Sequence, residues 1–468
     1  MEKRRYTTLH IYDFGPFEEA HVELAPFTIF IGKNSLGKSM LLYLIWVLES
    51  TLLDYRELYR LLLENGAEEI AKNILEAIRR KDHDIAKAIG QLLSIHFRVF
   101  PKAWAKSLKY ALHGAFGVQP RELVRLRAHT SKIIISSDMG EIEIIVEDNN
   151  VSARWVRLNT TIMEDVDVEL LGKNLLGLSI KDRMITVSCS SVIDLISDVF
   201  PAFEMMLHRM FTGIAGSSEG FESLLVDGRA GLSRALLIAY PGISRVVREI
   251  LSVDFQFIDN IYKSAKDYID GDVDLNAPAL SILLEELGFK PLIREEFGVP
   301  RVYIETWTGQ RLPLERAASG IRETMPVLLA LLSKDVSITY IEEPEAHLHP
   351  RAIRLMPRLM AYAVNKLGKH VRITTHSDIL ISQINNLIAL SANPEGAKEL
   401  GYEPLELLKP ESVRAYWLKR ANGHVEVIEL PVRETGFDEV EFAEVAEDLF
   451  VERGEVYRLL EAKKESGK

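Results

Sequence analysis

The sequence predicts an α/β protein whose mixed, partly parallel sheet has flanking helices and is interrupted by a large, mostly helical insertion. Three observations support this prediction. Between residues 320 and 391, apolar runs alternate with helical patterns, which is typical of parallel strands joined by crossover helices. A glycine-rich turn follows the apolar run 27–31, as at a strand-to-helix connection. Across 51–130, apolar residues recur at helical spacing.

The composition is that of a folded globular chain, with 468 residues, 47% of them hydrophobic and 26% charged. The formal net charge of -12 argues against a protein whose whole surface coats nucleic acid. The charge is uneven, because 51–130 holds 14 Lys and Arg against nine Asp and Glu, whereas 131–300 holds 15 against 27. Any contact with DNA is therefore expected on 51–130.

The sequence also predicts a cytoplasmic protein that does not associate with membranes. Cys189 is the single cysteine, so no intrachain disulfide or cysteine-based zinc site can form. The first residues do not lead into an apolar stretch typical of a secretory signal. The longest apolar runs, 41–48 and 325–332, fall well short of the roughly 20 residues that span a bilayer.

The N-terminal half is expected to begin with strands and continue with helices. Residues 8–31 read as two or three strands, and a helix follows over 38–53. The helical segment 51–130 comes next. Residues 131–158 are then expected to form strands, with a hairpin around residues 138–140, and a further strand is predicted over 184–188.

The C-terminal half is expected to hold the parallel part of the sheet. Helices are predicted over 191–212, 230–250, 254–270, 277–287, 320–332, 351–367 and 378–391. Strands are predicted over 289–294, 301–307, 336–341 and 370–375. A hairpin over 412–430 and an acidic helical tail over 437–464 close the chain.

A phosphate-binding loop is predicted directly after the apolar strand 27–31. The run from Gly32 to Ser39 fits the pattern G-x-x-x-x-G-K-[ST]. Its glycines let backbone N–H groups converge on phosphate oxygens at a helix N-terminus. Lys38 is expected to reach the β- and γ-phosphates, and the Ser39 hydroxyl to bind Mg²⁺. The residues expected to hold the nucleotide in this loop are Gly32, Asn34, Ser35, Gly37, Lys38 and Ser39.

Two carboxylates end the buried strand 336–341. We assign Glu342 to Mg²⁺ and Glu343 to orienting or deprotonating the attacking water. Most such motifs carry Asp at the first position, and Glu is one methylene longer. The nearby His347 and His349 with Glu345 have no diagnostic metal-ligand spacing, so no separate transition-metal site is expected.

A Ser-Gly pair begins the helix predicted over 320–332, and a histidine ends the strand 370–375. Ser319 can act as the helix N-cap, which presents backbone N–H groups to an anion. Gly320 lies 22 residues before Glu342, and His376 lies 33 residues after Glu343. A histidine in this position can donate a hydrogen bond to a γ-phosphate.

In this order, the motifs resemble those of the ABC-type ATPase superfamily, and within it the SMC/RecF-like and OLD-like heads. The runs LHIYDFGPF (9–17), FIGKNSLGKS (30–39) and IEEPEAHLHP (341–350) look like those of the AAA-type ATPases of prokaryotic defence islands. DGRAGL (227–232) resembles a short arginine-containing element of those proteins. The resemblance covers about 1–50 and 300–450, and it implies a split ATPase head.

The expected division of the chain follows from this resemblance. An ATPase head comprises 1–50 and 300–430. Residues 51–299 form the insertion, which is helical over 51–130 and mixed over 131–299, and 431–468 is the acidic tail.

The resemblance also implies a mechanism. Two heads enclose two ATP molecules, and Ser319 and Gly320 of one face the γ-phosphate held by the other. Glu343 supports hydrolysis and His376 senses the γ-phosphate. Ala318 and Glu323 depart from the Ser and Gln common at their positions, and Glu323 facing phosphate needs a compensating cation such as Arg322. A glutamine for the usual Q-loop has only two candidates, Gln91 and Gln119.

We therefore expect an ATP hydrolase that uses ATP and Mg²⁺, forms a homodimer or higher homo-oligomer around ATP, and switches a separate effector protein, in defence. An alternative is a RecF-like DNA-repair or DNA-loading ATPase. A scaffold that binds nucleotide without turnover is disfavoured by Glu343 and His376. The 281 residues between Lys38 and Ser319 exceed a transporter-type spacing, and no coiled-coil arm is evident. Only 92 residues follow His376, without an acidic cluster suited to a nuclease.

Overall fold

The computed structural model describes most of the chain. The described residues are 6–51, 53–80, 85–138, 140–159, 166–172, 174–180, 183–199, 203, 221–229, 231, 253–296, 298–440 and 442–466. Much of the helices expected over 191–212 and 230–250 lies outside them, as does the end of the run 227–232.

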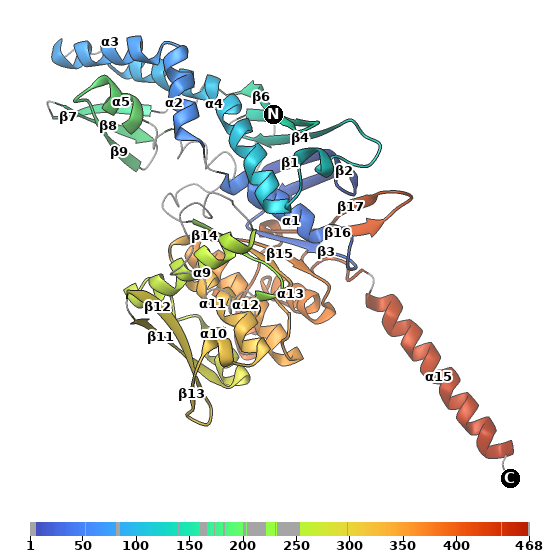
Figure 1. Cartoon of the computed structure of the whole chain (residues 1–468). Coiled ribbons are helices and arrows are strands. Elements are labelled where there is room, and N and C mark those ends of the chain that lie inside the picture. Colours follow the sequence, from blue (N-terminus) through green and yellow to red (C-terminus); the bar gives the residue numbers. More distant parts are fainter. Residues whose placement is uncertain are drawn as a thin grey trace.

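One large sheet of eleven strands organises the molecule, and it confirms the predicted mixed α/β fold (Figure 1). Its strand order is β10-β14-β15-β3-β16-β17-β2-β1-β4-β5-β6. The first five strands pair in parallel and are β10 (Phe221–Leu225), β14 (Val336–Glu342), β15 (His370–Thr375), β3 (Phe27–Ile31) and β16 (Val413–Arg420). All residues of β14, β15 and β3 are buried, as expected for strands covered on both faces.

The rest of the sheet is mainly antiparallel. Its strands are β17 (Val425–Leu430), β2 (Phe17–Leu24), β1 (Thr7–Phe14), β4 (Thr130–Ser137), β5 (Gly140–Glu147) and β6 (Asn150–Leu158). Only the link between β17 and β2 is parallel. β2 alternates largely between buried and exposed residues, which is typical of a sheet with one solvated face.

Helices cover the parallel half of the sheet. They are α1 (Lys38–Ser50), α9 (Val253–Asp270), α11 (Ser319–Leu332), α12 (Pro350–Leu367) and α13 (Asp378–Leu390). Beside them lie α10 (Pro278–Leu287) and a small antiparallel sheet of β11 (Phe289–Glu296), β12 (Val299–Thr306) and β13 (Arg311–Pro313). The helices and strands expected after residue 250 are thus present, with boundaries shifted by a few residues.

The segment 51–299 forms a helical arm and also contributes to the head. The arm consists of α2 (Tyr55–Glu64), α3 (Ala67–Arg80) and α4 (Ile85–Phe116), with β7 (Val166–Gly172), β8 (Leu175–Ile180), β9 (Arg183–Ser188) and α5 (Val192–Asp198) near its end (Figure 1). However, β4, β5 and β6 extend the main sheet, and β10 forms its parallel edge. α9 packs on α11 and β10. A boundary at residue 300 therefore does not follow the sheet.

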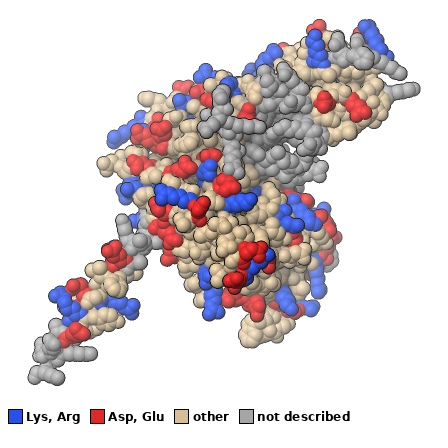
Figure 2. All heavy atoms as spheres, turned by 180° about the vertical axis from the view of Figure 1, so that it is seen from behind, with Lys and Arg blue, Asp and Glu red and all other residues tan. Residues whose placement is uncertain are grey.

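The C-terminal helix α15 (Phe442–Ser466) extends away from the rest of the molecule (Figure 1). Short elements complete the described chain: α14 (Pro394–Glu399) and the 3-10 turns η1 (Pro120–Leu123), η3 (Leu314–Arg316), η4 (Pro404–Glu406) and η5 (Pro410–Ser412). In Figure 2, basic and acidic side chains are interspersed over the visible face. Within the described part of the chain, none of the helices has the length and hydropathy needed to cross a bilayer.

Candidate functional site

The predicted site residues gather where three parallel strands end. Thr374 of β15 pairs in register with Phe30 of β3 on one side and with Glu342 of β14 on the other. The carboxyl ends of β3, β15 and β14 therefore lie level at one edge of the sheet. β15 separates the strand that leads into the phosphate loop from the strand that carries the two carboxylates. This order places His376, which follows β15, between them.

The loop after β3 has a backbone that requires glycine at two positions. Gly32 has φ 151° and Gly37 has φ 87°, a region that favours glycine. A Cβ on Gly32 would lie 2.7 Å from the Leu418 carbonyl oxygen, and one on Gly37 would lie 2.9 Å from the Phe17 ring. Ser35 is also left-handed, with φ 65°. The strand-loop-helix geometry expected of a phosphate loop is therefore present.

Lys38 lies within the loop. Its Nζ donates hydrogen bonds to the carbonyl oxygens of Gly32, at 2.7 Å, and Lys33, at 3.0 Å. The side chain is buried, with 6% exposure, whereas Asn34, Ser35 and Ser39 are exposed. The ammonium group is thus held over the loop that would surround a phosphate, and the loop's polar side chains are open to a ligand.

Glu342 is buried at the end of β14 and is held by two donors on one oxygen. Its Oε2 accepts a hydrogen bond from the Tyr43 hydroxyl at 2.6 Å and another from the Asp227 backbone N–H at 2.8 Å. Burial, followed by the Glu342 charge, raises the pKa of Tyr43, so this hydroxyl remains a donor. The Glu342 carboxylate is therefore held in one position by two donors from different elements.

Glu343 and His376 are brought together. The Glu343 Oε1 lies 3.0 Å from the His376 Nδ1, a hydrogen bond if the imidazole proton is on Nδ1. Glu343 has φ 44°, unusual for a residue other than glycine. Its N–H donates to the Thr374 carbonyl at 3.0 Å. This strained turn directs a partly exposed carboxylate toward the histidine.

A third carboxylate, that of Glu345, contacts the backbone of His376 and the side chain before it. Glu345 Oε1 accepts from the Thr375 hydroxyl at 2.5 Å and from the His376 backbone N–H at 3.2 Å. Burial raises the pKa of Glu345, although these hydrogen bonds oppose the shift. The sequence pattern indicates Glu345 only as a possible metal ligand. Its contacts with residues 375 and 376 depend on the sheet register, which the sequence does not reveal.

The start of α11 differs from the expected cap. Ser319 is the first helical residue, the N-cap is Ala318, and no side chain caps the helix. The prediction that Ser319 is the N-cap is therefore wrong by one position. Gly320 lies against residues 342–347 at the end of β14 (the acidic turn), because a Cβ there would be 2.8 Å from the His347 carbonyl oxygen. Ser319 and Gly320 thus lie beside the turn that follows Glu343 in the same chain.

Glu323 does not require Arg322 for compensation. It is buried, with 1% exposure, and its Oε2 lies 3.2 Å from the Nε of Arg229. Arg322 instead donates from Nη1 to the Glu315 carbonyl at 3.2 Å. The prediction that Arg322 compensates the charge of Glu323 is therefore wrong, because Arg229 is the cation paired with it. The sequence pattern indicates no role for Arg229, which stands within the run 227–232.

The two glutamine candidates lie on different elements. Gln91 is an exposed residue of α4, and Gln119 is an exposed residue that caps η1 through Glu122.

Oxygen atoms that could bind Mg²⁺ lie at the carboxyl edge of the sheet. Both hydrogen bonds to Glu342 fall on Oε2, and the Ser39 side chain is exposed. Carboxylate and hydroxyl oxygens, completed by water and phosphate, are what Mg²⁺ takes. Over the residues that the structure describes, no cluster of three His, Cys, Asp or Glu side chains could hold a metal ion by itself. The donors present therefore suit Mg²⁺ bound jointly with a nucleotide.

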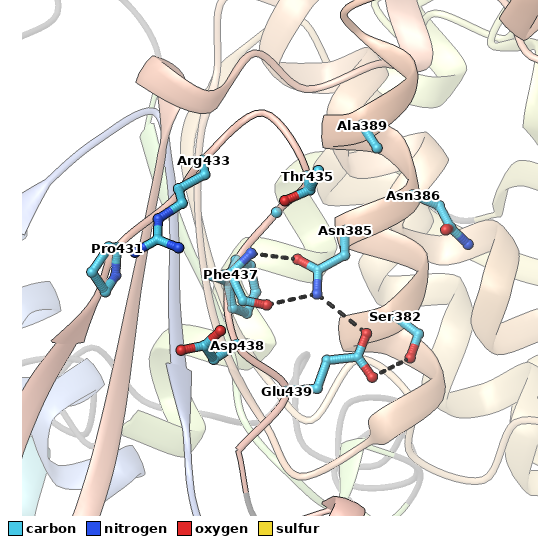
Figure 3. Close-up of a pocket in the computed structure, with 11 residues that line it drawn as sticks. Ser382, Asn385, Asn386, Ala389, Pro431, Arg433, Thr435, Phe437, Asp438 and Glu439 are labelled. Atoms are coloured by element: carbon cyan, nitrogen blue, oxygen red, sulfur yellow. Dashed lines mark hydrogen bonds between the residues drawn. The ribbon is translucent and has the colours of Figure 1, made fainter.

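A pocket of different character lies between α13 and the segment 431–439 (Figure 3). Asn385 bonds to both backbone groups of Phe437, with Nδ2 2.9 Å from the carbonyl oxygen and Oδ1 3.0 Å from the nitrogen. The Ser382 hydroxyl donates to Glu439 at 2.9 Å. These contacts attach the chain leading to α15 onto α13, and the pocket's polar groups largely bond to one another.

One part of the chain matches a known family of ATPase domains. Residues 247–381 match the family described as AAA ATPase domain. This span includes Ser319, Gly320, both carboxylates of the acidic turn and His376. The predicted resemblance to an ATPase domain is thereby confirmed over these residues.

Solved structures similar to this chain include three SMC head domains. One is the SmcHead bound to the C-winged helix domain of ScpA, with 10% identity, TM-score 0.41 and coverage of 92% of this chain and 98% of that one. The SMC head domain from Thermotoga maritima has 10% identity, TM-score 0.35 and coverage of 91% and 99%. An Smc head with an extended coiled coil, bound to the C-terminal domain of ScpA derived from Pyrococcus furiosus, has 11% identity, TM-score 0.39 and coverage of 96% and 99%. Similarity at this level does not extend to activity or partners. No curated protein sequence matches the chain.

Proposed function

We propose that this protein binds and hydrolyses ATP with Mg²⁺, dimerises around the nucleotide, and uses its nucleotide state to switch a separate cytoplasmic effector in defence. The observation that supports hydrolysis is the 3.0 Å contact between Glu343 and His376 at the sheet edge that carries the phosphate loop. A carboxylate beside an imidazole is suited to orient and deprotonate a water. A protein that only binds nucleotide would not need this pair.

Each site residue has a task in this proposal. The Lys38 ammonium exchanges the carbonyls of Gly32 and Lys33 for the β- and γ-phosphates. Ser39 and Glu342 hold Mg²⁺, which neutralises phosphate charge when bound. Glu343 accepts the proton of the attacking water, and His376 hydrogen-bonds to the γ-phosphate.

Dimerisation is proposed from the start of α11. Its first residues, Ser319 and Gly320, combine a small side chain with free backbone N–H groups at a helix N-terminus, which favours an anion. In the proposed dimer, this N-terminus completes the site of a second copy by contacting its γ-phosphate.

DNA binding is less favoured by the structure than by the charge count. Basic side chains of the arm pair with acidic ones: Arg60 with Glu57 and Glu64, Lys72 with Glu68, Arg80 with Glu76, and Lys106 with Glu57. Cations paired in this way are less available to phosphates. A RecF-like role predicts DNA-stimulated hydrolysis that weakens steeply with salt, and absence of stimulation by any DNA form at low salt would exclude it.

The test compares the wild-type protein with Glu343→Gln, using Glu395→Gln as a control because Glu395 lies on an exposed position of α14. We expect Glu343→Gln to reduce kcat about 100-fold or more, as for loss of a general base. It should retain ATP affinity and form a stable dimer by light scattering with ATP and Mg²⁺. Unchanged hydrolysis in Glu343→Gln would contradict the assignment.

A further inference from the structure

The turn after β10 holds the acidic turn through a buried arginine. Arg229 is 1% exposed. Its Nη1 donates to the Glu342 carbonyl at 2.6 Å and to the Val226 carbonyl at 3.1 Å, and its Nη2 donates to the Glu343 carbonyl at 3.2 Å. Together with the Asp227 N–H on the Glu342 carboxylate, this turn fixes both the backbone and a side chain at the end of β14.

The same guanidinium also contacts the first turns of α11. Its Nε donates to the Glu323 carbonyl at 3.0 Å and lies 3.2 Å from the Glu323 carboxylate. A second contact joins the same two parts, because Gly320 packs on the His347 carbonyl without room for a Cβ. The start of α11 is thus linked to the acidic turn at two places. Arg229 links it to Glu342 and Glu343, and Gly320 packs against His347.

The geometry of these contacts depends on an arginine. All three guanidinium nitrogens donate, and their acceptors come from the residue after β10, from the end of β14 and the residue after it, and from α11. A lysine ammonium carries the same charge but not the planar fork that reaches acceptors in several fixed directions. Burying such a charge is costly, and ion pairs of this kind often contribute little net stability relative to apolar side chains. Stability alone therefore gives a weak reason for this arrangement.

We propose that Arg229 is a positioning residue that sets the Glu343 turn relative to the N-terminus of α11. This inference rests on the proposed function, in which α11 contacts the ATP held by a second copy. Through Arg229, contact between α11 and that ATP fixes the main chain that carries Glu343. A head whose α11 is engaged then holds its own water-activating carboxylate in place, so the two sites of the dimer are coupled.

Arg229→Lys tests this role. We expect kcat to fall about 10-fold or more, while the Kd for a fluorescent ATP analogue in the presence of Mg²⁺ changes less than about 3-fold. This split arises because Arg229 contacts the turn of Glu343 and not the phosphate loop. Glu323→Gln provides a second variant that keeps the backbone contacts of Arg229 but removes its charge partner, and it should lower kcat by a smaller factor.

Arg358→Lys is the matched control. Arg358 on α12 is also a buried arginine paired with a buried glutamate, with Nη2 2.6 Å from Glu406 Oε2 and 2.8 Å from the Gly401 carbonyl. Its partners lie near η4 and not at the acidic turn. Arg358→Lys should lower the thermal midpoint about as much as Arg229→Lys does, but leave kcat per folded molecule unchanged.

The outcomes separate this inference from the proposed function. Loss of kcat with retained ATP affinity in Arg229→Lys, absent from Arg358→Lys, supports it. If Arg229→Lys and Glu323→Gln both hydrolyse ATP at the wild-type rate, the inference is wrong, whereas the proposed function is not affected. If Arg229→Lys does not fold, an unchanged kcat in Glu323→Gln overturns it by itself. No ATP turnover in the wild-type protein would overturn the proposed function, and the inference with it.

Discussion

Two regions of the same parallel sheet carry charged side chains in contrasting ways. In the sheet interior, Glu49 of α1 accepts from the Arg372 guanidinium of β15 on Oε1 and from the Tyr340 hydroxyl of β14 on Oε2. At the carboxyl edge, Glu343 and His376 contact each other while a quarter and about half of their side chains, respectively, stay exposed. Interior charges are enclosed by partners from the fold, whereas edge charges keep a face for a ligand.

The interior charges and the edge charges therefore serve different purposes. A charge removed from water must be paired to be tolerated, so the interior pair ties α1 to two strands and cannot easily be changed singly. At the edge, Lys38 binds carbonyls of its own loop, and the Glu343 and His376 side chains contact each other. A phosphate or a water can replace these partners. We therefore expect interior substitutions to change stability and edge substitutions to change ligand binding or turnover.

The largest effect is expected from Arg372→Met in the interior. This change leaves the buried Glu49 carboxylate without its cation, which costs about 3–5 kcal/mol of the free energy of unfolding. Urea unfolding followed by circular dichroism measures this loss. Adding Glu49→Gln to the variant should recover part of it. A loss below about 1 kcal/mol would show that the interior pair does not matter in this way.

Lys38→Ala, at the carboxyl edge, should weaken ATP binding and leave the stability of the protein almost unchanged. The lost ammonium-phosphate contact lowers ATP affinity about 100-fold, which corresponds to roughly 2.7 kcal/mol. The thermal midpoint without nucleotide should change little. Titration with a fluorescent ATP analogue measures the affinity, and Lys33→Ala, an exposed lysine of the same loop, serves as the control. Equal losses in both variants would contradict the assignment of Lys38.

The smallest effect is a pH dependence of stability from Glu222, a half-buried residue of β10. Burial, assisted by the Glu49 charge, raises the pKa of Glu222 on β10 to about 7, while Lys263 and Arg372 oppose the shift. The folded state therefore binds a proton that the unfolded state releases near pH 4.3. Its contribution to stability is present below that pH and is lost as the pH rises through about 7.

Glu222→Gln should remove this dependence. Relative to the wild-type protein, it should gain about 1–3 kcal/mol of unfolding free energy between pH 5 and pH 8. Urea unfolding at the two pH values measures the difference. An identical difference between variant and wild type at both pH values would rule out titration of Glu222 over this range.

The same contrast explains which features could be predicted from the sequence. β14 and β15 are buried throughout because both faces are covered, and β14 is mostly apolar. The phosphate loop needs glycine at local positions. The carboxylates and His376 end such strands, so their common edge followed from strand order. By contrast, most residues of β7 are exposed or half-buried, and this strand was not predicted.

Arg229 could not be assigned for a different reason. Its acceptors in Glu323, Glu342 and Glu343 lie 94 to 114 residues away in the sequence. Nothing local distinguishes this arginine from an exposed one. The register that brings β10 beside β14 creates its site, and the same long-range pairing places β10 in the head although the sequence assigned it to an insertion.

The central claim is that one edge of the sheet binds ATP for hydrolysis and is completed by a second copy. The most direct test is an experimental structure of the Glu343→Gln protein with ATP and Mg²⁺. We predict a dimer with the phosphates in the loop 32–39, Lys38 turned from the Gly32 carbonyl to the phosphates, and Ser319 of the second copy at the γ-phosphate. A monomer, or nucleotide bound away from this loop, would contradict the account.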